Sequence, residues 1–94
     1  MKYKVFVDDN YHYMDESHRY ELGEYNTLEK AIEACKKIVD EFLRANYKLG
    51  MTSGELSAQY ALYGEDPFII GADKVPFRAR DYARAKAEEI CHID

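Results

Sequence analysis

Apolar and polar positions alternate in residues 2–8. One face carries Tyr3, Val5 and Val7, and the other carries Lys2, Lys4, Phe6 and Asp8. A period of two with one apolar face is typical of a β-strand that is buried on one side. A second such run covers residues 19–25, in which Tyr20 and Leu22 share a face and a bulge at Gly23 could return Tyr25 to it. We expect these strands to form an antiparallel hairpin and to continue into the segment between them, with a turn near residues 15–17.

The next segment has the clearest pattern in the chain, because its apolar residues recur every three or four positions. These residues are Leu28, Ala31, Ile32, Cys35, Ile38, Val39, Phe42 and Leu43. The spacing predicts an amphipathic helix that lies on the hairpin and ends between residues 46 and 50. Asn26 is placed to cap the first turn, and Glu29 three positions later completes a capping-box pattern.

The pattern after Gly50 predicts three shorter elements. A short helix capped by Ser53 runs through Leu62 and stops at Gly64. We expect a turn over residues 64–67 and a short buried strand over residues 68–70.

The final element is a helix over residues 79–91. Its inward face is expected to hold Tyr82, Ala83, Ala87, Ile90 and Cys91. The small alanines would let this helix approach its neighbours closely. The element order predicts an α+β fold, in which a three-stranded, mainly antiparallel sheet carries helices on one face, and a single domain spanning residues 1–94.

Charge limits the classes of ligand. Eighteen acidic and 13 basic residues give a formal net charge of −5. Phosphate backbones are bound by excess Lys and Arg, so this balance argues against nucleic acid as the main ligand and is compatible with a basic protein partner. No apolar run reaches the ~20 residues that would cross a membrane. The first residues reach acidic positions too early for a signal peptide, and we expect Cys35 and Cys91 to be free thiols in a cytoplasmic protein.

The predicted hairpin holds the densest group of polar residues. Its oxygen and imidazole groups could bind a divalent metal through Asp8, Asp9, His12 and His18. Their spacing fits none of the specific metal motifs, so a solvated acidic hairpin without a cofactor is the favoured interpretation. No nucleophile motif or phosphate-binding glycine loop is present, and the sequence does not indicate an enzyme.

Two tyrosines in the same hairpin suggest a contact surface. Strand alternation would place Tyr11 and Tyr13 on one face and His12 on the other. The expected contact surface consists of Tyr11, Tyr13, Met14, Asp15 and Glu16. The alternative is that the rings only cover the edge of the core. Our first hypothesis is therefore a non-enzymatic protein-interaction domain whose partner is another protein or a second copy of the chain.

Two other functions remain open. One is a metal- or small-molecule-dependent enzyme that uses the Asp and His residues of the hairpin. The other is an acidic regulator that occupies the nucleic-acid site of a basic protein.

The last predicted helix carries a basic face made of Arg78, Arg80, Arg84 and Lys86. Arg84 is spaced to pair with Glu88, so the favoured interpretation is a solvated, partly self-paired face. The alternative is a contact with an anion or a nucleic acid.

Several segments resemble a known group of sequences. They are residues 5–16 (VFVDDNYHYMDE), 19–20, 22–25 and 64–68. In these segments the chain resembles a family of small uncharacterised bacterial proteins, over most of its length. The resemblance implies a self-standing bacterial domain and no particular activity or site.

Overall fold

The computed structural model describes residues 2–12, 19–71 and 77–91. The strands are β1 (Tyr3–Asp9), β2 (Tyr20–Tyr25) and β3 (Glu65–Ile70). The helices are α1 (Leu28–Asn46), α2 (Ser53–Tyr63) and α3 (Ala79–Cys91), and a short 3-10 helix, η1 (Asn10–His12), follows β1. This order confirms the predicted α+β fold class.

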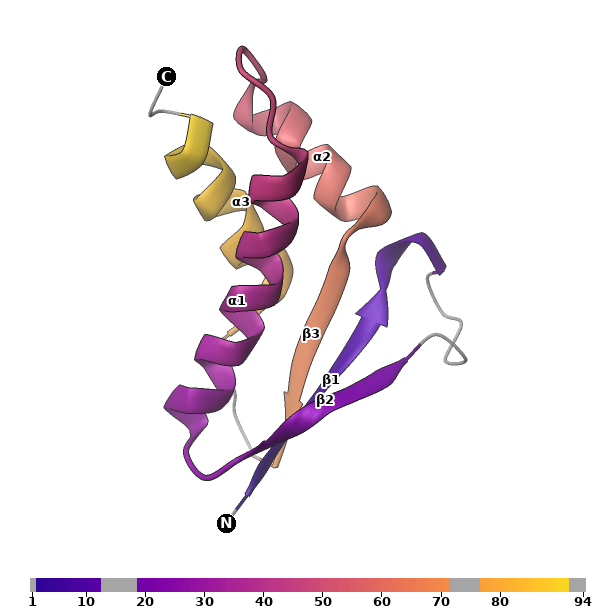
Figure 1. Cartoon of the computed structure of the whole chain (residues 1–94), viewed down its shortest axis with the longest axis vertical. Coiled ribbons are helices and arrows are strands. Elements are labelled where there is room, and N and C mark those ends of the chain that lie inside the picture. The colour runs from indigo at the N-terminus through magenta and orange to yellow at the C-terminus, as the bar shows by residue number, and fades with distance from the viewer. Residues whose placement is uncertain (1, 13–18, 72–76, 92–94) are drawn as a thin grey trace.

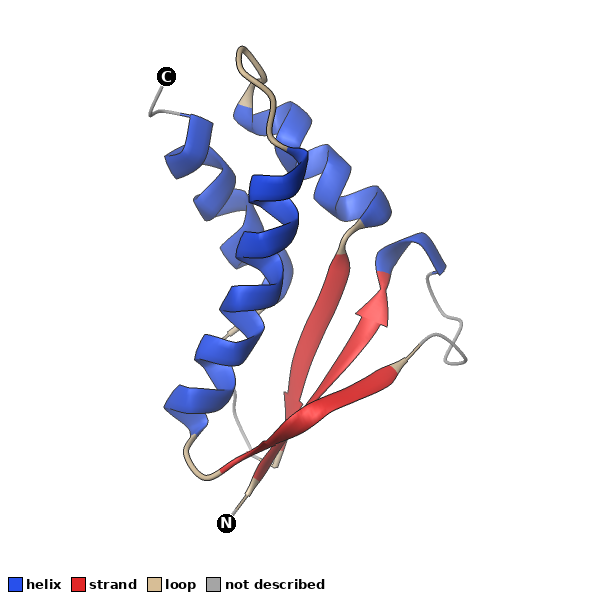
Figure 2. Ribbon diagram, viewed as in Figure 1, coloured by secondary structure: helices blue, strands red, loops and turns tan. Residues whose placement is uncertain are grey.

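The three strands form one antiparallel sheet in the order β2-β1-β3. The helices gather on one side of it, as predicted (Figures 1 and 2). Val5 and Val7 of β1 are buried under the helices. On the opposite face of the sheet the rings of Phe6 and Phe68 stack with their centroids 5.9 Å apart.

The predicted bulge in β2 is present. The pairing passes from Val5 opposite Gly23 to Phe6 opposite Glu21, so Leu22 is the extra residue. The bulge places Tyr25 on the helix side, where it packs against the buried cluster between the sheet and α1. Tyr20 and Leu22 remain exposed, because the first part of β2 runs away from α1 (Figure 1).

The expected turn over residues 64–67 is wrong. β3 begins at Glu65, and Pro67 lies within it, buried and opposite Val7 of β1. A proline has no N–H to donate to a sheet, but it is tolerated in an edge strand, which pairs on one side only. β3 is such a strand in the described sheet, because its one neighbour there is β1.

Helix α1 packs on two different clusters. Ala31 and Cys35, in its first half, lie against the sheet residues Val5 and Ile69. Its second half runs past the sheet and packs against α2 and α3 (Figure 1). The residues of that second cluster are Val39, Leu43, Leu56, Tyr60, Ala79, Ala83, Ala87 and Ile90. The predicted inward face of α1 is thus confirmed, and the helix joins two small cores.

The predicted caps are each one residue out of place. α1 is capped by Thr27 rather than Asn26, and the Thr27 side chain accepts a hydrogen bond from the backbone N–H of Lys30 at 3.1 Å. α2 is capped by Thr52 rather than Ser53, in a full capping box with Glu55. Each cap lies beside a second polar residue of similar capping strength, so local preference does not choose between them.

The last helix has its predicted bounds. Three alanines on its buried face, Ala79, Ala83 and Ala87, lie against α1 and α2. Within the described ranges, no helix is both long and apolar enough to cross a membrane.

Candidate functional site

The segment after β1 does not continue as a strand. The side chain of Asp9 accepts a hydrogen bond from the backbone N–H of Tyr11 at 2.9 Å and turns the chain into η1. A local side-chain bond of this kind competes with the strand conformation. Strand alternation therefore does not apply at Tyr11, and the expectation that the strand continues into the hairpin tip is wrong.

Asn10 fixes η1 to the end of α2, fifty residues later in the chain. Its side-chain Nδ2 donates to the carbonyl oxygen of Tyr60 at 2.9 Å, and its backbone N–H donates to that of Gly64, also at 2.9 Å. Gly64 itself donates to the Tyr60 carbonyl at 2.8 Å. Asn10 thus gives the Tyr60 carbonyl a second hydrogen bond and supplies a donor to the Gly64 carbonyl just past the helix end, and these bonds set the position of η1.

This attachment brings two exposed aromatic rings together. The rings of Tyr11, in η1, and Tyr63, in the last turn of α2, stack with centroids 5.6 Å apart and an angle of 25° between their planes. Tyr11 is 64% exposed and Tyr63 is 53% exposed. We call these two residues the tyrosine pair.

Sequence reasoning found only one member of the tyrosine pair. The expected short helix reached Leu62, so Tyr63 was not singled out. The sequence feature that could have identified Tyr63 is its position directly before Gly64, at the end of the predicted helix. Of the other residues expected in the contact surface, Tyr13, Met14, Asp15 and Glu16 lie outside the described residues.

Carboxylates gather beside the tyrosine pair, where β1 ends and β3 begins. In the sheet register Asp8 lies opposite Asp66, and Asp9 lies opposite Glu65. We call these four residues the acidic corner. Successive strand residues point to opposite faces, so each face of the sheet receives one pair of acids.

The two acids on the outer face differ in their partners. Arg19 binds Asp8 through two hydrogen bonds, at 2.6 and 3.1 Å, and its guanidinium lies 5.0 Å from the ring centre of Phe68. Asp66 has no ion-pair partner in the described part of the chain. Burial raises the pKa of the Asp66 carboxyl, and the charge of Asp8 raises it further, while Arg80 acts in the opposite direction.

Glu65 connects the acidic corner to two more tyrosines. The hydroxyl of Tyr20 donates to its carboxylate at 2.7 Å, and the hydroxyl of Tyr60 donates to its backbone carbonyl, also at 2.7 Å. Burial, together with the hydrogen bond to Glu65 and its charge, raises the pKa of Tyr20 to about 12. Both hydroxyls therefore stay neutral at physiological pH and hold Glu65 in place.

The proposed metal ligands are not assembled by the described residues. Asp8 and Asp9 point to opposite faces of the sheet, and Asp8 is already bound by Arg19. In residues 2–12, 19–71 and 77–91, no group of three His, Cys, Asp or Glu residues is arranged to hold a metal ion. His18 and the side chain of His12 lie outside the described part, so the metal hypothesis stays a prediction.

The two cysteines are free thiols. Cys35 is buried, as predicted, and Cys91 is partly buried. Burial raises the pKa of Cys35 to about 11, and the charge of Asp66 contributes to the shift. Since the thiolate is the reactive form, Cys35 is not suited to act as a nucleophile.

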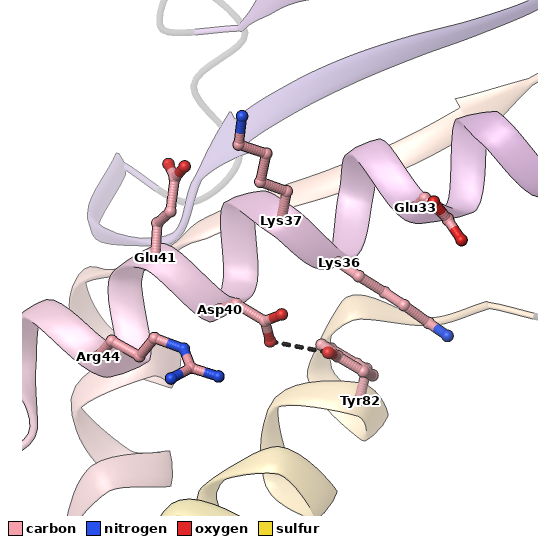
Figure 3. A pocket seen from close by; sticks show the side chains of 7 residues that line it. All are labelled: Glu33, Lys36, Lys37, Asp40, Glu41, Arg44 and Tyr82. Carbon is pink, nitrogen blue, oxygen red and sulfur yellow. Dashed lines mark hydrogen bonds between the residues drawn. The ribbon is translucent and has the colours of Figure 1, made fainter.

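A groove of about 330 Å³ between α1 and α3 is a second candidate (Figure 3). Its lining consists of Glu33, Lys36, Lys37, Asp40, Glu41, Arg44 and Tyr82. Tyr82 donates a hydrogen bond to Asp40 at 2.7 Å, and the Lys36 ammonium lies 5.5 Å from the centre of its ring. Three acids and three bases alternate along the groove, so it favours neither anions nor cations. These contacts attach α3 to α1, and we interpret the groove as structural.

The tyrosine pair beside the acidic corner is therefore the strongest candidate for a contact site. Comparison of the chain with protein-family models, with curated proteins and with solved structures finds no match, so no family is assigned.

Proposed function

We propose that this chain is a non-enzymatic protein-interaction domain whose contact surface is the tyrosine pair, with the acidic corner as its rim. The observation that carries the proposal is that Tyr11 and Tyr63 stack on each other while each stays more than half exposed. Tyrosine is enriched in protein interfaces, because its ring supplies apolar area and its hydroxyl tolerates water.

The tyrosine pair is arranged before any partner binds. Asn10 holds η1 on the end of α2 through one backbone and one side-chain hydrogen bond, and the two rings support each other. A side chain that is already ordered loses less conformational entropy on binding, which strengthens the complex. An aromatic pair without such support would be a weaker contact surface.

Charge favours a basic partner over a second copy. Asp9, Glu65 and Asp66 lie beside the tyrosine pair, and residues 51–73 contain four acids and no base. Two copies that met at this surface would bring two acidic corners together, and like charges across an interface disfavour association. A partner with Lys or Arg around an apolar centre would complement both parts of the surface.

The test compares capture from a lysate of the source organism by three immobilised chains. They are the unchanged chain, the double variant Tyr11→Ser with Tyr63→Ser, and the control Leu49→Ser. Leu49 is 85% exposed in the loop between α1 and α2, away from the tyrosine pair. We expect the same protein to be retained by the unchanged chain and the control, and to be lost with the double variant.

The salt dependence of capture and the comparison among the three chains complete this test. Capture should weaken as salt rises, because the acidic corner contributes through a screened electrostatic attraction. Equal capture by all three chains, with the double variant folded by circular dichroism, would show that the tyrosine pair is not the contact surface.

A further inference from the structure

A second cavity lies between α2 and α3. It has a volume of about 220 Å³, and its lining consists of Ser57, Tyr60, Ala61, Arg80, Ala83 and Arg84. The two helices share one buried cluster, to which Leu56 and Tyr60 of α2 and Ala83 of α3 belong. The cavity is separate from the tyrosine pair, none of whose atoms line it.

The two arginines of this cavity are unpaired within the described part of the chain. No salt bridge or hydrogen bond there engages the guanidinium of Arg80 or Arg84, and the expected pair between Arg84 and Glu88 does not form. Among the other cations of the described residues, Arg19 pairs with Asp8 at 2.6 Å and Lys86 pairs with Glu89 at 3.5 Å, whereas Arg44 and Arg78 also form no ion pair there. Both arginines are exposed, and the feature that distinguishes them is that they line the same cavity, in a chain with a net charge of −5.

The other lining residues suit an anion. No carboxylate lines the cavity, Ser57 supplies a hydroxyl, and Ala61 and Ala83 leave room because their side chains are small. The hydroxyl of Tyr60 is bonded to the Glu65 carbonyl, and burial raises its pKa, so it adds no negative charge.

Position along α3 adds to the positive potential. The helix begins at Ala79, so Arg80 lies in its first turn, where the helix dipole is positive. Arg84 follows one turn later on the same face, since residues four apart in a helix are neighbours. Asp66 attracts Arg80 only from beyond ion-pair distance.

We propose that this cavity binds a phosphomonoester dianion, with Arg80 and Arg84 on its oxygens and Ser57 as a hydroxyl donor. Guanidinium groups match phosphate geometry through paired hydrogen bonds, and a dianion makes use of both charges. The cavity is smaller than the roughly 300–1,000 Å³ of drug-sized ligand sites, so it suits a phosphate group with a small substituent. The inference does not depend on the tyrosine pair.

The test is a titration of the ¹⁵N-labelled chain, at constant ionic strength, followed by NMR. The probes are inorganic phosphate, glycerol phosphate and a peptide that contains phosphoserine. We expect saturable shifts of the amide signals of Ser57, Ala61 and Ala83. If the peptide binds more tightly than the other probes, the natural source of the phosphate is a phosphorylated protein. If glycerol phosphate binds as tightly as the peptide, the natural source is a small molecule.

Matched variants distinguish specific binding in the cavity from non-specific attraction to the positive charges of the surface. Arg80→Gln with Arg84→Gln should weaken binding by about tenfold or more, as expected for the loss of charge-assisted hydrogen bonds. Arg44→Gln with Arg78→Gln removes the same charge outside the cavity and should leave binding within about twofold, because neither side chain lines the cavity. Ser57→Asp puts a carboxylate into the cavity, keeps both arginines, and should also abolish binding.

Two outcomes would overturn the proposal. One is the absence of saturable shifts at the cavity with all three probes. The other is an equal loss of binding in the two double arginine variants, which would show that only the overall charge matters.

Discussion

Two tyrosine hydroxyls near the helical core differ in their partners. Tyr60 donates to the Glu65 carbonyl at 2.7 Å, whereas the hydroxyl of Tyr47 is buried and has no hydrogen-bond partner among the described residues. Removal of the Tyr60 hydroxyl leaves a carbonyl without its donor, so Tyr60→Phe should lower the free energy of unfolding by about 1–2 kcal/mol. Removal of an unsatisfied hydroxyl should be neutral or stabilising, so Tyr47→Phe should change that free energy by between zero and about +1 kcal/mol.

Urea unfolding at neutral pH measures both changes. The two variants make the same chemical change in aromatic residues of one cluster, so each serves as the control for the other. Equal destabilisation by both would contradict the hydrogen-bond assignment of the two hydroxyls.

The thiol of Cys35 predicts a loss of stability in alkaline solution. Its pKa rises from the ordinary value of 9.0 to about 11 in the folded chain, mainly through burial. The unfolded chain therefore releases this proton at a lower pH than the folded chain does. The resulting stability is complete below pH 9.0 and is lost as pH rises toward about 11. The loss from this group should be about 3 kcal/mol, since each pKa unit corresponds to about 1.4 kcal/mol.

Chemical unfolding at several pH values between neutral and alkaline checks this prediction. Cys35→Ala should be less stable at neutral pH, because it leaves a small cavity, but its stability should fall less steeply above pH 9.0. Some slope should remain, because the pKa of Tyr20 is raised as well. An unchanged slope in the variant would contradict the assignment to Cys35.

The junction of α2 and β3 depends on a glycine. A Cβ at Gly64 would lie 2.7 Å from the carbonyl oxygen of Tyr60, the oxygen that also accepts from Asn10. Gly64→Ala should therefore cost about 2 kcal/mol or more, as overpacking does, and should loosen η1. Gly54 is the matched control, because a Cβ there meets only the Thr52 hydroxyl, at 3.9 Å.

Gly54→Ala should stabilise the chain by about 0.5–1 kcal/mol, since alanine favours the helix more than glycine does. Thermal unfolding of both variants measures the contrast. A stabilising Gly64→Ala would show that the end of α2 is not packed as the structure has it.

The elements that the sequence predicted well are those with a strong local pattern. The repeating apolar positions of α1 and the alanines of α3 predicted which residues are buried, and the bounds of α3 are confirmed. The placement of the Thr27 and Thr52 caps failed by one residue, because neighbouring polar residues have similar capping strength. Pro67 was assigned to a turn, because its place in an edge strand depends on which strand β3 pairs with.

The candidate site could be predicted only in part, because it depends on contacts between segments that are distant in the sequence. Tyr11 was named for a contact surface with its exposure left open, and the structure exposes 64% of its side chain. Its partner Tyr63 lies 52 positions later, and the hydrogen bonds of Asn10 that bring the two together also join distant segments. Such contacts follow from the complete fold and leave no pattern in either local segment.

At the scale of the whole molecule, α1 connects two small cores. Its first half packs on the sheet and its second half packs on α2 and α3, so the chain extends over 44 × 27 × 19 Å. The tyrosine pair is placed where the sheet meets α2, because η1 continues β1 and is bonded to the end of α2 (Figure 1). The contact surface thus depends on the packing between the two parts of the fold.

The central claim is that a partner protein covers the tyrosine pair, and hydrogen exchange of the captured complex tests it most directly. Amide exchange is measured by mass spectrometry in the free chain and in the complex. We predict slower exchange in the complex for peptides that contain residues 10–12 and 60–64, with no change in the loop over residues 47–51. Unchanged exchange at both segments, with protection confined to another surface such as the groove between α1 and α3, would contradict the claim.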